Sequence, residues 1–442
     1  MNHISYLREV QGHLLIGILL AASVLAIHGT TAQAQGVVST PITRLGYGIL
    51  EQPATVAWKG MGGVGIGMSN NKVINLANPA GAAATDSLSF LIDLGASVNM
   101  GHYRDEKHSK STFLGGLDYL ALQFPVYKDR IALSAGFIPF SHAGYGLVQE
   151  VDIKGEETTS TIVQNFTGSG SLQSAYGGIG VRVWDDFMIG ANVRYLFGKL
   201  THTVHTIPSS TILSQTYNVY TLRLASLGLD FGAQYRIRLG SESQDNIILG
   251  ATYTPQLTIK PELSFNENRN YGSADKPQIT ERAETMETAT PHKIGVGFSW
   301  SRADKMIIAG DFSTSLWDSV NNIFVNDGLT LTNSYAGALG VEFLPDRYSR
   351  KFADRMYYRG GVNYESNYYK TDLLGQTHKV GVTFGIGMPI SSISTDRSSI
   401  INLTLGYDRT FSTVQREVSQ NILKLSLGIT FNETWFRKLK IY

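Results

Sequence analysis

His202 and His205 are the only close pair of histidines in the strand-rich part of the sequence. Two imidazoles can hold a transition metal when both reach the same ion. These two residues lie three apart in an extended pattern, and side chains at that spacing point to opposite faces of a strand. We therefore expect the polar end of a strand near an external rim, and no metal site.

The patterns on which enzymatic chemistry depends are missing. The chain contains no cysteine, which excludes thiol nucleophiles, disulfides, cysteine-linked lipid anchors and cysteine-ligated zinc. It contains no nucleophile elbow, His-Glu-x-x-His helix or phosphate-binding loop. A formal charge of +1 offers no support for nucleic-acid binding, which needs a basic surface. We predict no enzymatic activity, no cofactor and no nucleic-acid partner.

Two short motifs stand out before the first predicted strand, in a Gly- and Ala-rich segment, 36–86, that lacks strand alternation. Gly62 to Gly67 reads Gly-Gly-Val-Gly-Ile-Gly, whose spacing differs from that of the dinucleotide-binding fingerprint. We interpret these glycines as allowing tight backbone packing. The second motif, Asn78-Pro79-Ala80-Gly81, is also common turn chemistry. The segment is predicted to be a separate unit.

The N-terminus carries an export signal. An apolar run from Leu14 to Ile27 follows Arg8 and precedes Ala32-Gln33-Ala34, which is the order of parts in a secretory signal peptide. The run is shorter than the roughly 20 apolar residues of a spanning helix. We predict a signal peptide over residues 1–34, with cleavage after Ala34.

The rest of the chain reads as strands. Near the C-terminus, Leu423, Leu425 and Leu427 alternate with polar or small residues, and this period of two is typical of a strand with one apolar face. The same pattern gives about 14 strands, an even number as in outer-membrane barrels. The predicted spans are 87–100, 112–125, 131–142, 170–184, 187–205, 216–238, 246–262, 289–301, 305–320, 332–344, 355–369, 375–389, 398–413 and 418–431.

The connections favour a transmembrane barrel, because short turns such as 127–129, 185–186 and 303–304 alternate with long polar segments. These segments, 143–169, 263–288 and 321–331, are expected as external loops. The proposed strands are long enough that we also expect a tall, polar wall outside the membrane. The alternative is a soluble β-sandwich, which rarely needs so many uniform strands.

Charges and aromatic residues fit this arrangement. The less apolar face is predicted to carry charges toward the lumen, where they cost little: Arg182, Arg194, Asp230, Arg236, Asp311, Glu342 and Arg359. Aromatic girdles at the membrane interfaces explain most aromatic residues of the wall: Trp184, Tyr195, Phe197, Tyr253, Tyr358, Tyr364 and Trp435. Trp317, on the same face as Asp311, is the exception, and we predict that it contacts a ligand.

Asn78, Pro79 and Ala80, placed after a glycine-rich segment and just before the first strand, resemble the hatch motif of the FadL family of outer-membrane transporters. The resemblance implies a hatch over residues 35–86 inside a 14-stranded antiparallel barrel over residues 87–442. It also implies a monomer in the outer-membrane bilayer that passively transports hydrophobic small molecules such as long-chain fatty acids. The ending Phe431 to Phe436 resembles FadL-related proteins of the Bacteroidetes, whose substrates are often undefined.

Members of that family release ligand sideways through a gap made by a kink in the third strand. Pro139 falls in the third predicted strand and cannot donate a ladder hydrogen bond, which indicates a bulge or a break in pairing. Gly136, Gly144 and Gly146 would ease the bend. The alternative interpretation is that Pro139 merely ends the strand at the outer rim.

Three functions follow from these patterns. The first is passive transport of an apolar molecule, with release by hatch movement or laterally into lipid. The second is a general diffusion porin, against which the hatch argues. The third is an adhesive or structural surface barrel whose external segments bind a partner.

Overall fold

The computed structural model describes residues 41–44, 46–104, 109–154, 159–209, 215–240, 245–270, 278–303, 305–323, 328–390, 399–415 and 417–434. The predicted signal peptide, the first residues of the predicted hatch and Trp435 lie outside these ranges. No described helix is long and apolar enough to cross a membrane.

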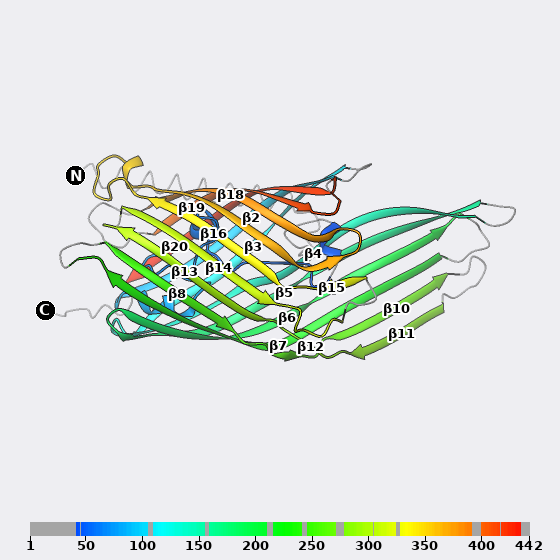
Figure 1. The fold of residues 1–442 in the computed structure, drawn as a ribbon, viewed down its shortest axis with the longest axis horizontal. Coiled ribbons are helices and arrows are strands. Elements are labelled where there is room, and N and C mark those ends of the chain that lie inside the picture. Colours follow the sequence, from blue (N-terminus) through cyan, green and yellow to red (C-terminus); the bar gives the residue numbers. More distant parts are fainter. Residues whose placement is uncertain are drawn as a thin grey trace, which may run out of the picture. The chain divides into compact units, whose positions relative to one another are not determined.

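The described chain forms a closed antiparallel barrel of 14 strands, as predicted (Figure 1). The barrel closes where the first of these strands pairs with the last, from Ser89↔Thr434 to Arg104↔Ser419. The strands are β2 (Ser89–Arg104), β3 (Ser109–Tyr127), β4 (Ile131–Lys154), β5 (Thr159–Trp184), β6 (Phe187–Pro208), β7 (Gln215–Arg238), β8 (Asn246–Thr254), β13 (His292–Arg302), β14 (Met306–Leu316), β16 (Ser334–Phe343), β17 (Tyr357–Thr371), β18 (Gly375–Pro389), β19 (Ile400–Ser412) and β20 (Ser419–Thr434).

Side-chain alternation separates an apolar outer face from a polar inner face. In β20 the side chains of Leu423, Leu425 and Leu427 are exposed, whereas Ser426 and Thr430 are buried. A water-soluble sheet would bury the apolar face instead, so this pattern is that of a wall in contact with lipid. Trp184, Tyr195, Tyr253, Tyr358 and Tyr364 are also exposed on the outside, consistent with the predicted girdles.

Two segments that we expected to be external loops are strands instead. Residues 143–169 mostly continue β4 and β5, which pair from Pro139↔Gln173 to Lys154↔Thr159. Most of 263–288 forms β10 (Glu262–Asn270) and β11 (Gln278–Thr285), and β10 adds to β7. The prediction was wrong because both faces of a sheet outside the membrane meet water, so the alternation that marks a strand disappears.

The N-terminal segment, which we define as the described residues between 41 and 86, contains little regular structure. Its elements are η1 (Pro41–Arg44), β1 (Ile49–Leu50), α2 (Val56–Lys59) and η2 (Pro79–Ala84). Its apolar side chains pack on inward residues of the wall: Val56 and Leu76 join Leu91 of β2, and Trp58 and Met61 join Ala309 of β14. The segment therefore supplies the core of the barrel interior.

Candidate functional site

A belt of wall glycines surrounds the N-terminal segment. A Cβ atom added at any of them would lie 3.0 Å or less from a backbone or side-chain atom of that segment, so only glycine fits without a shift. Several belt glycines pair directly across strands, as in Gly180↔Gly190↔Gly232 and Gly340↔Gly361. We call these residues the glycine belt: Gly180, Gly190, Gly232, Gly250, Gly297, Gly340, Gly361, Gly385 and Gly428.

Wall side chains form hydrogen bonds with the backbone of the glycine run from Gly62 to Gly67. The Asp311 carboxylate accepts hydrogen bonds from the backbone N–H groups of Gly65, Ile66 and Gly67. Gln234 Nε2 donates to the Ile66 carbonyl oxygen at 3.0 Å. On the segment side, a Cβ at Gly67 would meet the Phe298 backbone at 2.5 Å, which confirms the predicted tight packing.

The Asn78-Pro79-Ala80 motif is buried where the segment meets β7 and β8. Asn78 caps η2, since its Oδ1 accepts from the Ala80 N–H at 3.0 Å, and Pro79 occupies the first position of that helix. The Asn78 Nδ2 donates to the carbonyl oxygens of Ile66 at 2.9 Å and of Ala233 at 3.3 Å. The motif thus joins a helix cap to contacts with the wall.

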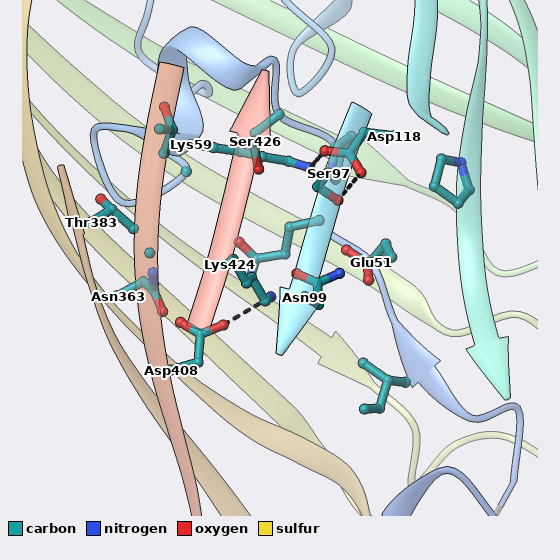
Figure 2. Close-up of a pocket in the computed structure, with 18 of the residues that line it drawn as sticks. Glu51, Lys59, Ser97, Asn99, Asp118, Asn363, Thr383, Asp408, Lys424 and Ser426 are labelled. Atoms are coloured by element: carbon teal, nitrogen blue, oxygen red, sulfur yellow. Dashed lines mark hydrogen bonds and ion pairs between the residues drawn. The ribbon is translucent and has the colours of Figure 1, made fainter. Parts of the chain in front are cut away.

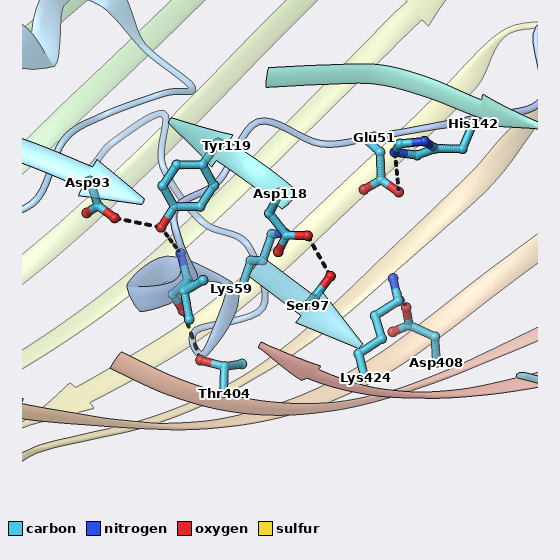
Figure 3. A network of polar contacts seen from close by, with 11 residues as sticks. Glu51, Lys59, Asp93, Ser97, Asp118, Tyr119, His142, Thr404, Asp408 and Lys424 are labelled. Atoms are coloured by element: carbon cyan, nitrogen blue, oxygen red, sulfur yellow. Dashed lines mark hydrogen bonds and ion pairs between the residues drawn. The ribbon is translucent and has the colours of Figure 1, made fainter. Parts of the chain in front are cut away.

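A buried polar network fixes the other side of the segment (Figure 3). The Tyr119 hydroxyl accepts from the Val56 N–H at 2.8 Å and donates to Asp93 at 2.8 Å, and Thr430 also donates to Asp93. Lys59 of α2 forms an ion pair with Asp118 at 2.7 Å. The Asp118 side chain is 5% exposed and that of Lys59 28% exposed, so the pair mainly offsets the hydration that Asp118 loses and adds little net stability.

The first cavity encloses about 140 Å³ and is lined by charged residues whose charges are already balanced. Figure 2 shows Lys59 paired with Asp118 and Lys424 paired with Asp408. Lys379 pairs with Glu365. The lysines are therefore neutralised by neighbours, and the cavity is polar without an excess of positive charge.

The barrel wall is interrupted beside this cavity. The β3–β4 ladder runs only from Tyr127↔Ile131 to Leu120↔Phe137. Beyond it, β3 pairs with β2 alone and β4 pairs with β5 and β1. We call this gap between residues 109–119 and 138–154 the wall interruption. Tyr119 from one edge and Pro139 from the other both line the first cavity.

A bulge marks the same place in β4. The register with β5 shifts between Pro139 and Ser141, which leaves Phe140 as the extra residue. The strand continues to Lys154, so the alternative that Pro139 ends the strand is wrong. The N-terminal segment occupies the freed edge: Ile49 pairs with His142, and Thr43 Oγ1 donates to the Gly144 carbonyl oxygen at 2.8 Å.

A second cavity of about 160 Å³ is also lined by the N-terminal segment and is mainly apolar. The two cavities share lining residues in the N-terminal segment and in β4, among them Leu50, Ile138 and Pro139. Trp317, the predicted ligand contact, lines the second cavity and is buried. Its ring lies 4.8 Å from that of Tyr368 and 6.0 Å from that of Tyr47.

The remaining predicted residues have structural partners. Gly136 lies where a Cβ would meet the Leu120 carbonyl oxygen at 2.6 Å and the Tyr176 ring at 2.7 Å. His202 contacts the Tyr145 hydroxyl at 2.8 Å, and the ring of His205 lies against that of Tyr217. Among the described residues, no cluster of His, Asp and Glu is arranged to hold a metal ion.

The predicted inward charges do face the lumen. Arg194 and Asp230 form an ion pair at 2.6 Å, as do Arg359 and Glu342. Ser174, Tyr176 and Asn192 also line the second cavity and were not predicted from the sequence. Ser174 and Tyr176 lie two apart along β5, and Asn192 of β6 pairs with Gly178, a further two residues along β5. This inward polar spacing was a usable signal, since polar residues on an inward face mark lumen contacts.

Residues 16–442 match the family model described as BamG. No curated protein matches the sequence. Among solved structures, the chain is similar to the CymD monoaromatic hydrocarbon channel, with a TM-score of 0.56, 12% identity and coverage of 88% of this chain and 100% of that one. For the Ralstonia pickettii toluene transporter TbuX the TM-score is 0.55 and the identity 13%, with coverage of 87% of this chain and 99% of that one. For a Pseudomonas aeruginosa FadL homologue the TM-score is 0.55 and the identity 14%, with coverage of 86% of this chain and 99% of that one. These likenesses establish a common fold.

Proposed function

The chain belongs to the BamG family, and from this premise and its FadL-type outer-membrane barrel we propose that it passively passes small hydrophobic molecules across the outer membrane. A molecule from outside enters the cavities around the N-terminal segment and leaves sideways into lipid at the wall interruption. The transfer needs no energy source beyond the gradient and the burial of apolar surface, worth about 0.8 kcal/mol per CH₂ group.

The wall interruption carries this proposal. Both cavities reach Pro139, at the point where the β3–β4 ladder has ended. Gly136, Pro139 and Gly144 are proposed to shape this opening, and Trp317 to contact the ligand. The solved proteins of similar fold include a monoaromatic hydrocarbon channel and a toluene transporter, which supports a ligand of one ring rather than a long-chain fatty acid.

The N-terminal segment is proposed to act as a fixed hatch in which Asn78, Pro79 and Ala80 secure the contact with the wall. The dense contacts along the glycine belt favour lateral release over hatch movement. They also count against a general diffusion porin, which needs an open lumen. We further propose that the protein is a monomer without enzymatic activity, related to the Bacteroidetes branch that its C-terminal residues resemble.

A cross-link across the wall interruption tests the lateral route. Leu117 and Phe140 would face one another if the β3–β4 ladder continued, so a cysteine pair there can be joined by a short bis-maleimide in this cysteine-free chain. We expect joined protein in liposomes to transfer toluene at least about tenfold more slowly. The control joins Leu403 and Leu427, which already pair in β19 and β20. Equal transfer by both would contradict the lateral route.

A second candidate function is a surface barrel that binds a partner. The outer parts of β4 to β7 and the β10–β11 hairpin expose Val148, Tyr217 and Ile279, and β11 pairs only with β10 among the described strands. Deleting residues 263–288 separates the two functions. Loss of a binding partner with unchanged toluene transfer would favour this second function for the hairpin.

A further inference from the structure

Lys199 of β6 and Arg223 of β7 lie directly opposite one another on the outer face of the wall. Their neighbours along the strands, Leu200, Leu222 and Leu224, are buried in an interior apolar cluster. Because successive side chains of a strand point to opposite faces, Lys199 and Arg223 point outward. Both side chains are exposed.

The two positive charges are not balanced by the protein. Directly opposite side chains have their Cβ atoms about 4.5–5.5 Å apart, and like charges at that position are destabilising. Glu262 of β10 lies opposite Arg223 on the other side, but one carboxylate offsets at most one of the two cations. Within the part of the chain that the structure describes, neither Lys199 nor Arg223 forms an ion pair. An anion shared by both side chains would remove the repulsion.

The apolar band of β6 ends immediately before this pair. Tyr195 and Leu227 pair across β6 and β7 and are exposed on the outer face, and the ring of Phe197 stacks on that of Tyr195 at 5.3 Å. The other edge of the band is Phe187, which pairs with the exposed Tyr235. This stretch of β6 corresponds to the roughly 9–11 residues with which a strand crosses a bilayer, and aromatic residues bound it at both ends.

Lys199 and Arg223 therefore lie at the level of the lipid headgroups. Lys199 is two residues beyond Phe197, about 7 Å along the strand, and the next outward pair, Thr201 and Thr221, is polar. The opposite end of β6 follows a short turn after β5, which is typical of the periplasmic side. The charged pair thus faces the outer leaflet.

We propose that Lys199 and Arg223 bind a phosphate group of a phosphorylated glycolipid in the outer leaflet. The phosphate oxygens accept charge-assisted hydrogen bonds from the ammonium and guanidinium groups. The acyl chains of the same lipid extend into the bilayer, along the apolar surface of Tyr195 and Leu227. The proposal goes beyond the proposed transport function and depends only on the position of the barrel in the outer membrane.

Binding of diphosphoryl lipid A to the purified full-length protein tests the proposal. Isothermal titration calorimetry in detergent gives the dissociation constant. We expect the double substitution Lys199→Gln and Arg223→Gln to weaken binding at least about tenfold. The matched control is Arg302→Gln with Lys305→Gln, which removes two exposed cations beside the short turn between β13 and β14. Equal affinities of the two double variants overturn the proposal.

Glu262→Gln is a further variant, with an expected effect of opposite sign. It removes the carboxylate that lies opposite Arg223 and keeps both cations, so the affinity for diphosphoryl lipid A should rise several-fold. Tighter binding cannot result from a misfolded protein. Unchanged or weaker binding would contradict a phosphate at this position.

Two further ligands separate the lipid from the phosphate alone. Lipid A without its phosphates keeps the acyl chains, and we expect it to bind at least about tenfold more weakly than the diphosphoryl form. Inorganic phosphate keeps the charge and lacks the chains, so it should also bind at least about tenfold more weakly. Equal binding of the phosphate-free lipid overturns the role of the two cations, and equal binding of inorganic phosphate overturns the assignment to a lipid.

Discussion

The backbone N–H of Glu51 donates a hydrogen bond of 2.9 Å to the carbonyl oxygen of Phe140, the residue that bulges out of the β4–β5 ladder. The N-terminal segment therefore begins its course through the lumen on the strand edge that β3 has left. A kink in the wall and the position of the segment depend on one another.

Replacing Glu51 with proline removes this N–H donor. We expect β1 to detach from β4, because a two-residue strand has few other hydrogen bonds, and transfer of small apolar compounds to rise several-fold. Glu51→Gln keeps the N–H group and should behave like the unchanged protein. Amide hydrogen exchange at Ile49 and Leu50 and liposome transfer are the measurements, and equal exchange at these two residues in both variants would contradict the expectation.

Gly232→Ala should destabilise the folded barrel by about 1–3 kcal/mol, the usual cost of forcing extra atoms into a packed interior. The added Cβ would collide with the Asn78 side chain and with Pro79 Cδ. Gly177→Ala is the control, since a Cβ there meets nothing within 4 Å. The urea concentration at the midpoint of unfolding, followed by gel mobility, is compared for the two variants. Equal midpoints would contradict the packing argument.

Asn78→Ala should cost about 1–3 kcal/mol, because the change strips η2 of its cap and leaves the Ile66 carbonyl with one fewer donor. The loss should appear as faster proteolysis of residues 66–86 in the otherwise intact barrel. Asn71→Ala, which removes only an exposed hydrogen bond to Asp86, is the comparison. Similar cleavage rates in both variants would contradict the proposal that Asn78 anchors the N-terminal segment to the wall.

A disulfide between cysteines at positions 56 and 428 should lock the N-terminal segment to the wall. A Cβ at Gly428 lies 2.7 Å from that of Val56, so a small backbone shift brings the pair to the roughly 3.8 Å typical of disulfides. Because the proposed route is lateral, we expect toluene transfer to change less than about twofold on oxidation. Transfer that stops on oxidation and returns on reduction would mean that the segment must move.

Asp408→Asn should be more damaging than removal of the whole ion pair. It leaves Lys424 without its 2.8 Å partner. Because the Lys424 side chain is 31% exposed, we expect a loss of about 1–2 kcal/mol, smaller than for a fully buried charge. The double variant Asp408→Leu and Lys424→Met should recover most of the loss. The measurement is the unfolding midpoint of the single and the double variant. A double variant as unstable as the single one would refute the charge argument.

The sequence predicted the barrel because lipid imposes a strict alternation on residues such as Leu423, Leu425 and Leu427. The same signal fails outside the membrane, which is why residues 143–169 and 263–288 were expected as loops. Pro139 indicated a defect in the third strand, since proline has no N–H to donate. The strand that pairs with β4 beside this defect, Ile49–Leu50, could not be predicted, because two residues are too few to show an alternating pattern.

Much of the candidate site depends on contacts between residues far apart in the chain. Asp311 was predicted to face the lumen, but its hydrogen bonds to Gly65, Ile66 and Gly67 follow only from the closed barrel. The same holds for Tyr119, which joins Val56 to Asp93. Alternation tells which face a side chain takes, and it does not tell which loop backbone lies opposite.

The glycine belt also sets the order of assembly. The closing pair of strands, β2 and β20, is joined by contacts such as Thr430 to Asp93, which are separated by 337 residues. Gly428 of β20 lies against Val56, and the belt leaves no clearance for a segment to be threaded in after closure. We therefore expect the N-terminal segment to be seated on the unfinished sheet before the last strand pairs, so that it serves as the template around which the barrel closes.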